Sequence, residues 1–273
     1  MKKFIKIFKR SKVVIGMIHI EALPGTPKSK NSIASIIDKA KREAETYKKA
    51  GVDAIAIENM HDTPYLNKNV GPEITAVMTR VGAEIKRVVN NMPVGIQILA
   101  AANKEALAVA QAAELDFIRA EGFVFGHIGD EGYIESCAGE LLRYQKQIGA
   151  ENILIFTDIK KKHSSHSITS DVSIEETAHA AEFFMSDGVI VTGVATGTEA
   201  NPEEIIAVKK SVKIPVIVGS GVTYENLESY LKISDALIVG SYFKKRGYWE
   251  NELDFAKTKK FMDKAKKIRD SIS

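Results

Sequence analysis

The sequence repeats one pattern nearly from end to end: a short apolar segment followed by a segment with helical periodicity. The apolar segments lie at residues 13–19, 53–59, 93–99, 116–121, 153–159, 188–193, 215–220 and 235–240. Most are rich in Val, Ile and Ala and apolar on both faces, which is typical of buried parallel strands. Eight strands that alternate with helices predict a closed (β/α)8 TIM barrel, and 273 residues suit one such domain.

An open doubly wound sheet is the alternative fold. It would be expected to carry a G-x-G-x-x-G motif after the first strand, and "GMIHIEALPGTP" (16–27) lacks that motif. No linker or low-complexity tract marks a second domain, so residues 1–273 are predicted to form a single (β/α)8 domain. Residues 1–11, "MKKFIKIFKRS", are a basic extension or an element that covers the bottom of the barrel. A membrane-surface helix and a mitochondrial presequence are alternatives for this segment.

Composition and charge exclude several classes of protein. The 38 basic and 35 acidic residues nearly balance, and no DNA-reading motif is present, so we expect no nucleic-acid partner. The single cysteine, Cys137, excludes internal disulfides and fits a reducing compartment. No apolar run is long enough to span a membrane. We expect a cytoplasmic protein with at most peripheral membrane contact, a mitochondrial location being the alternative. Aromatic residues within 242–249 suggest a homo-oligomer contact.

Polar side chains occur where the predicted strands end. The active site of a TIM barrel lies at the carboxyl ends of its strands. The candidates for catalysis there are His19, Glu58, Glu121, Asp158 and Lys160. A buried acid at such a position is costly unless it is paired, bound to a metal or used in proton transfer. Glu58 and Asp158 are also candidate ligands of a divalent ion such as Mg²⁺. No other cofactor is indicated, and simple pairing with a neighbouring Lys or Arg is the alternative for each acid.

Two glycine turns follow the seventh and eighth predicted strands. Loops at these two places form the usual phosphate site of a TIM barrel, and a helix that begins near Thr223 would add its positive end. The alternative is that the glycines serve only tight turns. The predicted phosphate-binding residues are Gly219, Ser220, Gly221, Gly240 and Ser241. The sequence therefore predicts a phosphorylated small-molecule ligand, such as a sugar phosphate or a phosphoribosyl compound.

Two strand-to-helix loops exceed the usual length. They are "GFVFGHIGDEGYIES" (122–136) and "KKKHSSHSITSDV" (160–172). Long loops on the catalytic face of a barrel are typical of lids and binding loops. The second loop is predicted to close on an anionic substrate through Lys160 or His163, a solvated flexible loop being the alternative.

Four motifs resemble those of the BtpA/SgcQ family of TIM-barrel proteins. They are "GMIHIEALPGTP" (16–27), "AGVDAIAIENMHDTPY" (50–65), "FTDIKKKHSSH" (156–166) and "GSGVTYEN" (219–226). The resemblance spans about residues 12 to 260 and implies a (β/α)8 barrel. The family is named after a photosynthetic member linked to the accumulation of photosystem I, a protein peripheral to the thylakoid membrane. The resemblance implies no catalytic role for any residue.

Two functions follow as hypotheses. The first is an isomerase, lyase or hydrolase that acts on a phosphorylated small molecule. The second, which the family name suggests, is a non-enzymatic assembly or stability factor for a membrane protein complex. A scaffold should fill its barrel mouth with apolar side chains, whereas an enzyme should place polar groups there.

Overall fold

A closed parallel barrel forms the centre of the molecule. The computed structural model describes residues 1–193 and 197–272. Within these residues eight strands close in the order β1-β11-β10-β9-β7-β4-β3-β2. They are β1 (Val13–His19), β2 (Ala54–Glu58), β3 (Val94–Gln97), β4 (Phe117–Ala120), β7 (Leu154–Ile159), β9 (Gly188–Val191), β10 (Val216–Val218) and β11 (Ala236–Val239). The predicted TIM barrel is confirmed, since each of the eight apolar segments contributes one barrel strand and the open sheet does not form.

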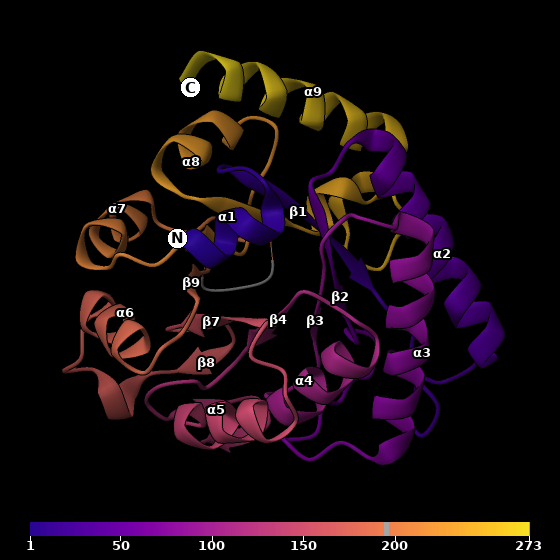
Figure 1. Cartoon of the computed structure of the whole chain (residues 1–273), viewed down its shortest axis with the longest axis horizontal. Helices are drawn as coiled ribbons and strands as arrows, with labels where there is room; N and C mark the ends of the chain where they lie inside the picture. Colours follow the sequence, from indigo (N-terminus) through magenta and orange to yellow (C-terminus); the bar gives the residue numbers. More distant parts are fainter. Residues whose placement is uncertain (194–196, 273) are drawn as a thin grey trace.

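Helices surround the barrel on its outer side (Figure 1). They are α2 (Ile33–Ala50), α3 (Pro72–Val89), α4 (Asn103–Ala112), α5 (Ala138–Gln147), α6 (Ile174–Phe183), α7 (Pro202–Ser211), α8 (Leu227–Ile233) and α9 (Phe255–Ile272). Local sequence sets several of the starts. Ser173 accepts a hydrogen bond from the amide of Glu176 in a capping box, and Asn201 caps the helix that Pro202 opens. None of the helices in the described ranges is long and apolar enough to cross a membrane.

The start of α8 differs from the prediction. Thr223 does not open this helix, because its amide donates to Asn226 Oδ1 at 2.7 Å in a local turn. The helix begins only at Leu227. Its N-cap residue is Asn226, whose side-chain amide donates to the carbonyl oxygen of Gly221 at 2.9 Å.

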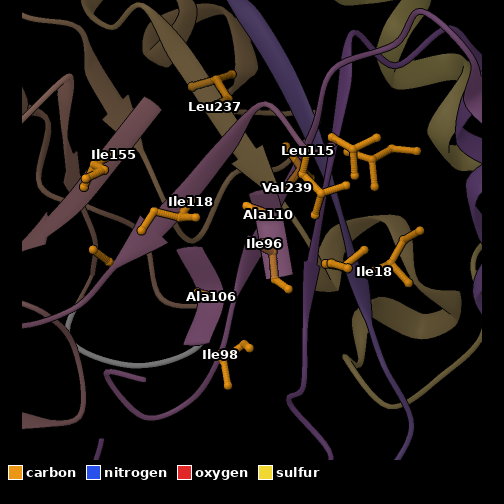
Figure 2. Close-up of a cluster of buried hydrophobic side chains, with 14 of the residues drawn as sticks. Ile18, Ile96, Ile98, Ala106, Ala110, Leu115, Ile118, Ile155, Leu237 and Val239 are labelled. Atoms are coloured by element: carbon orange, nitrogen blue, oxygen red, sulfur yellow. The ribbon is translucent and has the colours of Figure 1, made fainter. Parts of the chain in front are cut away.

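The core has two parts, because successive strand side chains face opposite sides of the barrel wall. The outer part packs the strands against the helices. Figure 2 shows a portion of it, where Ile96 and Ile118 of the strands belong to the same buried cluster as Ala106 and Ala110 of α4. The inner part fills the barrel itself with side chains such as Met17, so the barrel is a packed core and not a channel.

The amino-terminal segment closes one end of the barrel. Figure 1 shows α1 (Lys2–Phe8) lying across the ring of strands. Phe4 and Phe8 are 1% and 5% exposed and belong to the inner core. The ring centroid of Phe4 lies 6.1 Å from that of Phe156, and the ring centroid of Phe8 lies 5.6 Å from that of Phe117. The lysines of α1 are exposed, so this basic segment uses its apolar face inside the molecule.

The two long loops meet in a small antiparallel sheet at the opposite end. Its strands are β5 (His127–Gly129), β6 (Gly132–Ile134) and β8 (Ser164–Ser165), in the order β6-β5-β8. Short 3₁₀ helices also follow the strands: η1 (Ser167–Thr169), η2 (Ser241–Phe243) and η3 (Lys245–Gly247). The long loops are thus ordered against each other in this structure.

Candidate functional site

A cavity of about 220 Å³ lies at the carboxyl ends of the barrel strands. The side chains of His19, Glu58, Arg119 and Lys162 line it, together with the loops that follow β10 and β11. His19 and Glu58 pair in register as the last residues of β1 and β2. The inner face of the barrel thus changes from apolar near its bottom to polar at its mouth. This is the composition that we expected of an enzyme and not of a scaffold.

His19 and Glu58 face each other across one edge of the cavity. His19 Nδ1 lies 3.1 Å from the carbonyl oxygen of Trp249, to which it donates a hydrogen bond. This contact leaves Nε2 as the acceptor nitrogen, 3.9 Å from Glu58 Oε2. Burial, reinforced by the charge of Lys244, lowers the pKa of His19 to about 3. The imidazole is therefore neutral at pH 7.

The pKa of the Glu58 carboxyl group is shifted upward. Burial raises the pKa of Glu58, although the positive charges of Arg119 and Lys162 oppose the shift. A carboxyl group with a raised pKa is suited to hold and donate a proton, whereas an imidazole with a pKa of about 3 is a weak base that offers Nε2 as a hydrogen-bond acceptor. The two predicted residues are thus brought together at one edge of the cavity.

Asp158 is bound by a buried arginine. Arg119 Nε and Nη2 donate to the two carboxylate oxygens of Asp158, each at 2.8 Å. Burial alone would lower the pKa of Arg119, but the Asp158 carboxylate raises it overall, so the guanidinium keeps its charge. Asp158 itself does not line the cavity; it orients Arg119, which does. Arg119 was not among the predicted site residues.

The carboxylates of the predicted metal site have other surroundings than a metal ion would need. Both oxygens of Asp158 are engaged by Arg119. In residues 1–193 and 197–272, no group of three or more His, Cys, Asp or Glu side chains is arranged to hold a metal ion. Asp158 is thus engaged by Arg119, and a divalent ion held by Glu58 and Asp158 stays a prediction.

Three consecutive lysines have three different environments. Lys160 Nζ donates to the carbonyl oxygen of Thr169 at 2.8 Å, away from the main cavity. Lys161 Nζ donates to Glu121 Oε1 at 3.2 Å. The side chain of Lys162 lines the cavity, and within the described part of the chain its ammonium group has no hydrogen bond or ion pair. Lys162, and not the predicted Lys160, reaches the site.

The backbone at Lys160 explains why this side chain does not reach the cavity. Strand β7 ends at Ile159, and Lys160 has a φ of 46°, in the left-handed region. The chain turns there, so Lys160 does not continue the inward alternation that Asp158 began. A sequence signal for such a turn is weak, because left-handed backbone favours glycine and no glycine is present.

Glu121 also lies outside the cavity. Its Oε2 accepts a hydrogen bond from the amide of Ala101 at 2.9 Å, and its Oε1 accepts the one from Lys161. Glu121 is buried, with 7% of the residue exposed. Glu121 therefore follows the alternative stated for each acid, a buried carboxylate tied to a neighbouring base.

The first two residues of the glycine turn after β10 have structural partners. The amide of Gly219 donates to the carbonyl oxygen of Val191 at 2.8 Å, which extends the barrel hydrogen bonding. The hydroxyl of Ser220 accepts from the amide of Gly193 at 2.7 Å and donates to the carbonyl oxygen of Thr198 at 3.0 Å. The Gly219 amide and the Ser220 hydroxyl are therefore not open to a phosphate.

Other amides beside the cavity are open. Gly221, Val222, Gly240 and Ser241 line the cavity, and none of their amide groups donates a hydrogen bond within the described residues. We call these four residues the amide cluster. A Cβ added at Gly240 would lie 3.3 Å from His19 Nε2, so glycine keeps the backbone open beside the imidazole. Convergent backbone amides of this kind suit an anion.

Gly221 has a second reason to be glycine. Its φ is 69°, and a Cβ there would lie 2.3 Å from the Cα of Glu199. The turn would be glycine even without a ligand, so the identity of this residue alone does not establish a phosphate site.

Solved structures with the same architecture support the fold. (S)-3-O-geranylgeranylglyceryl phosphate synthase from Thermoplasma acidophilum gives a TM-score of 0.60 at 15% identity, covering 97% of this chain and 98% of that chain. Orotidine 5'-monophosphate decarboxylase from Methanocaldococcus jannaschii gives 0.58 at 16% identity, covering 92% and 97%. At such low identity the likeness shows the TIM-barrel fold alone.

Sequence relatives are closer. An uncharacterized mitochondrial protein of Caenorhabditis elegans is 52% identical over 254 residues, which is 92% of this chain and 91% of that protein. Photosystem I biogenesis protein BtpA of Synechocystis sp. is 30% identical over 257 residues, 94% of this chain and 88% of that protein. The model of the BtpA family matches residues 10–267. The resemblance inferred from the four sequence motifs is thus confirmed, and the chain belongs to the BtpA family.

Proposed function

We propose that this protein is an enzyme that binds a phosphorylated small molecule at the barrel mouth and transfers protons on it. The observation that carries the proposal is one cavity lined both by open backbone amides and by His19, Glu58 and Lys162. The substrate class is a sugar phosphate or a phosphoribosyl compound. Isomerase and lyase chemistry fit best, because both need a group such as the Glu58 carboxyl that can give and take a proton.

The amide cluster would hold the phosphate. Strands β10 and β11 are neighbours in the barrel, so the loops that follow them share one side of the cavity. Lys162 and Arg119 add positive charge, which favours an anion. The structural neighbours lend support, since one of them is described in complex with sn-glycerol-1-phosphate. This site differs from the predicted one in that Val222 enters it, while Gly219 and the Ser220 hydroxyl have other partners.

The reacting end of the ligand would extend from its phosphate toward Glu58. A Cβ at Gly219 would lie 3.6 Å from Arg119 Nη2, so the guanidinium lies near the glycine turn. Glu58 in its protonated form would give a proton to a developing oxyanion and, once ionised, would remove one from carbon or oxygen, while His19 Nε2 would accept a hydrogen bond from the ligand. Arg119, oriented by Asp158, would stabilise negative charge in the transition state.

Two observations favour this proposal over a membrane-associated assembly factor. The apolar side chains of α1 that a membrane-surface helix would insert, Phe4 and Phe8, are buried in the barrel. The mouth of the barrel is polar, where a scaffold would be apolar. We propose a cytoplasmic location; the printed name of the C. elegans relative makes a mitochondrial location the alternative.

The test is ligand binding with a size-matched pair of variants at Ser241, which is partly exposed beside the cavity. Thermal shift is measured with a panel of phosphorylated sugars and with the same sugars without phosphate. A phosphorylated compound is expected to raise Tm, and its parent sugar is not. Ser241→Asp should abolish the shift, because it places a carboxylate next to the phosphate. Ser241→Asn has the same size without the charge and should retain most of the shift.

Equal loss of binding in both Ser241 variants would mean that size and not charge decides, which contradicts an anion at the amide cluster. Equal shifts with and without phosphate would contradict it as well. If no compound of the panel binds, and metabolites carried through native purification include no phosphorylated compound, the proposed function is wrong.

A further inference from the structure

Lys162 is a basic residue at the barrel mouth. Among the described residues its ammonium group has no hydrogen-bond or ion-pair partner. The buried lysines Lys244 and Lys161 are paired: Lys244 Nζ donates to both carboxylate oxygens of Glu43, at 2.9 and 2.8 Å, and Lys161 donates to Glu121. Lys162 is partly buried, and an ammonium group withdrawn from water without a counter-ion costs free energy. Lys162 therefore has a reason to be there that the stability of the fold does not provide.

Its surroundings lower the pKa of Lys162. Burial and the nearby charge of Arg119 both lower the pKa of Lys162, while Glu58 and Asp158 act in the opposite direction with less effect. A lysine that is desolvated next to another cation is the usual form of a nucleophilic amine. Arg119 cannot take this role, because a guanidinium stays protonated and here it is bound to Asp158.

The position of Lys162 within the cavity matters equally. The amide cluster already offers hydrogen bonds for a phosphate, so Lys162 is not needed for that contact. It lines the same cavity as Glu58 and His19, where the reacting end of the ligand would lie. The amine of Lys162 and the carboxyl group of Glu58 thus line one cavity.

We propose that Lys162 forms a covalent imine with the carbonyl group of a phosphorylated aldehyde or ketone bound in this cavity. The inference rests on the proposed function and narrows its substrate class to carbonyl compounds. It also narrows the chemistry, since an iminium withdraws electrons from the neighbouring carbon and so assists proton removal or carbon–carbon cleavage there.

The step balances without an oxidant or a metal. The amine nitrogen of Lys162 adds to the carbonyl carbon, and the π electrons of the C=O bond move to oxygen, which takes a proton from Glu58. The nitrogen then loses a proton to the Glu58 carboxylate. Glu58 gives this proton to the hydroxyl group, which leaves as water while the nitrogen lone pair forms the C=N bond, and the resulting iminium returns a proton to Glu58. Amine and carbonyl thus give imine and one water, and hydrolysis reverses the step.

The experiment traps the imine with sodium cyanoborohydride, which reduces C=N to a stable secondary amine. The full-length protein is incubated with dihydroxyacetone phosphate, glyceraldehyde 3-phosphate and other phosphorylated aldehydes and ketones of three to six carbons. Intact mass and peptide mapping then locate the adduct. We expect one adduct at Lys162, at least tenfold above any other lysine. Lys162→Arg should remove it, and Lys160→Arg, two residues away on the same loop, should retain it.

Thermal shift measured in parallel separates this inference from the proposed function. Glycerol 3-phosphate and inorganic phosphate, which have no carbonyl, should raise Tm without leaving an adduct. If phosphorylated carbonyl compounds raise Tm but no adduct forms, or if adducts spread over surface lysines and persist in Lys162→Arg, the imine is refuted and the proposed function stands. If neither a thermal shift nor an adduct is found with any compound, both are refuted.

Discussion

Replacing His19 tests the electrostatics of the barrel mouth without requiring a ligand. The imidazole is 7% exposed, and its pKa is lowered from 6.5 to about 3 by burial. In the unfolded chain the same group should titrate near its ordinary value. As the pH falls below about 6.5, the unfolded chain therefore binds a proton that the folded protein does not bind. The contribution of His19 to the free energy of unfolding is therefore present above about pH 6.5 and is lost as the pH falls toward 3.

The size of the effect follows from the two pKa values. With a pKa of about 3 folded and 6.5 unfolded, linkage gives a loss of about 3 kcal/mol between pH 7 and pH 4.5 from His19 alone. His19→Asn removes the titrating group and keeps an amide that can donate to the Trp249 carbonyl. The variant should therefore lose about 3 kcal/mol less stability than the natural protein over the same pH interval.

Urea unfolding at pH 7 and pH 4.5 measures both losses. Glu58 has a raised pKa, so its contribution is present at low pH and is lost as the pH rises through its folded pKa. The natural protein and His19→Asn both contain Glu58. Its contribution to the pH dependence therefore largely cancels when the two stability losses are subtracted. His179→Asn, on the exposed face of α6, is the control and should leave the pH dependence unchanged. If His19→Asn and the natural protein lose the same stability within about 1 kcal/mol, the neutral, buried imidazole is refuted.

Three further predictions concern particular side chains. Asp158→Asn leaves Arg119 buried with a neutral partner and should lower the free energy of unfolding by about 3–5 kcal/mol in urea titration, whereas a loss under about 1 kcal/mol would show that the pair is not buried in solution. Phe4→Ala removes a ring that is 1% exposed and should cost about 3–5 kcal/mol in the same assay; an unchanged stability would mean that α1 does not close the barrel. Gly240→Ala places a methyl group against the neighbouring imidazole and should weaken ligand binding at least tenfold by titration calorimetry. Gly139→Ala, a helical glycine of α5, is its control, and equal affinity in both variants would contradict the amide cluster.

The fold was predictable because its signal is repeated. Each barrel strand is apolar on both faces and is followed by an amphipathic helix, so eight weak local signals add to one strong pattern. The same pattern fixes which end of each strand carries the site. His19 and Glu58 followed from that rule alone, since each ends its strand on the inner face.

The parts that failed depend on backbone geometry and on pairing. Nothing in "KKK" at 160–162 says which lysine faces the cavity; a left-handed residue at Lys160 decides it. Asp158 and Glu121 look alike at strand ends, but each is engaged by a base whose reach cannot be read from spacing. The glycine turn was recognised, but its first amide belongs to the barrel hydrogen bonding. Tertiary contacts, not local sequence, determine these outcomes.

The most direct test of the central claim is a crystal structure of the protein with a phosphorylated compound that raises its Tm. The account predicts phosphate density within hydrogen-bonding distance of the backbone amides of Gly221, Val222, Gly240 and Ser241, with the rest of the ligand extending toward Glu58 and Lys162. Density for the phosphate at another place, with these amides bound only by water at a saturating concentration of the ligand, would contradict it.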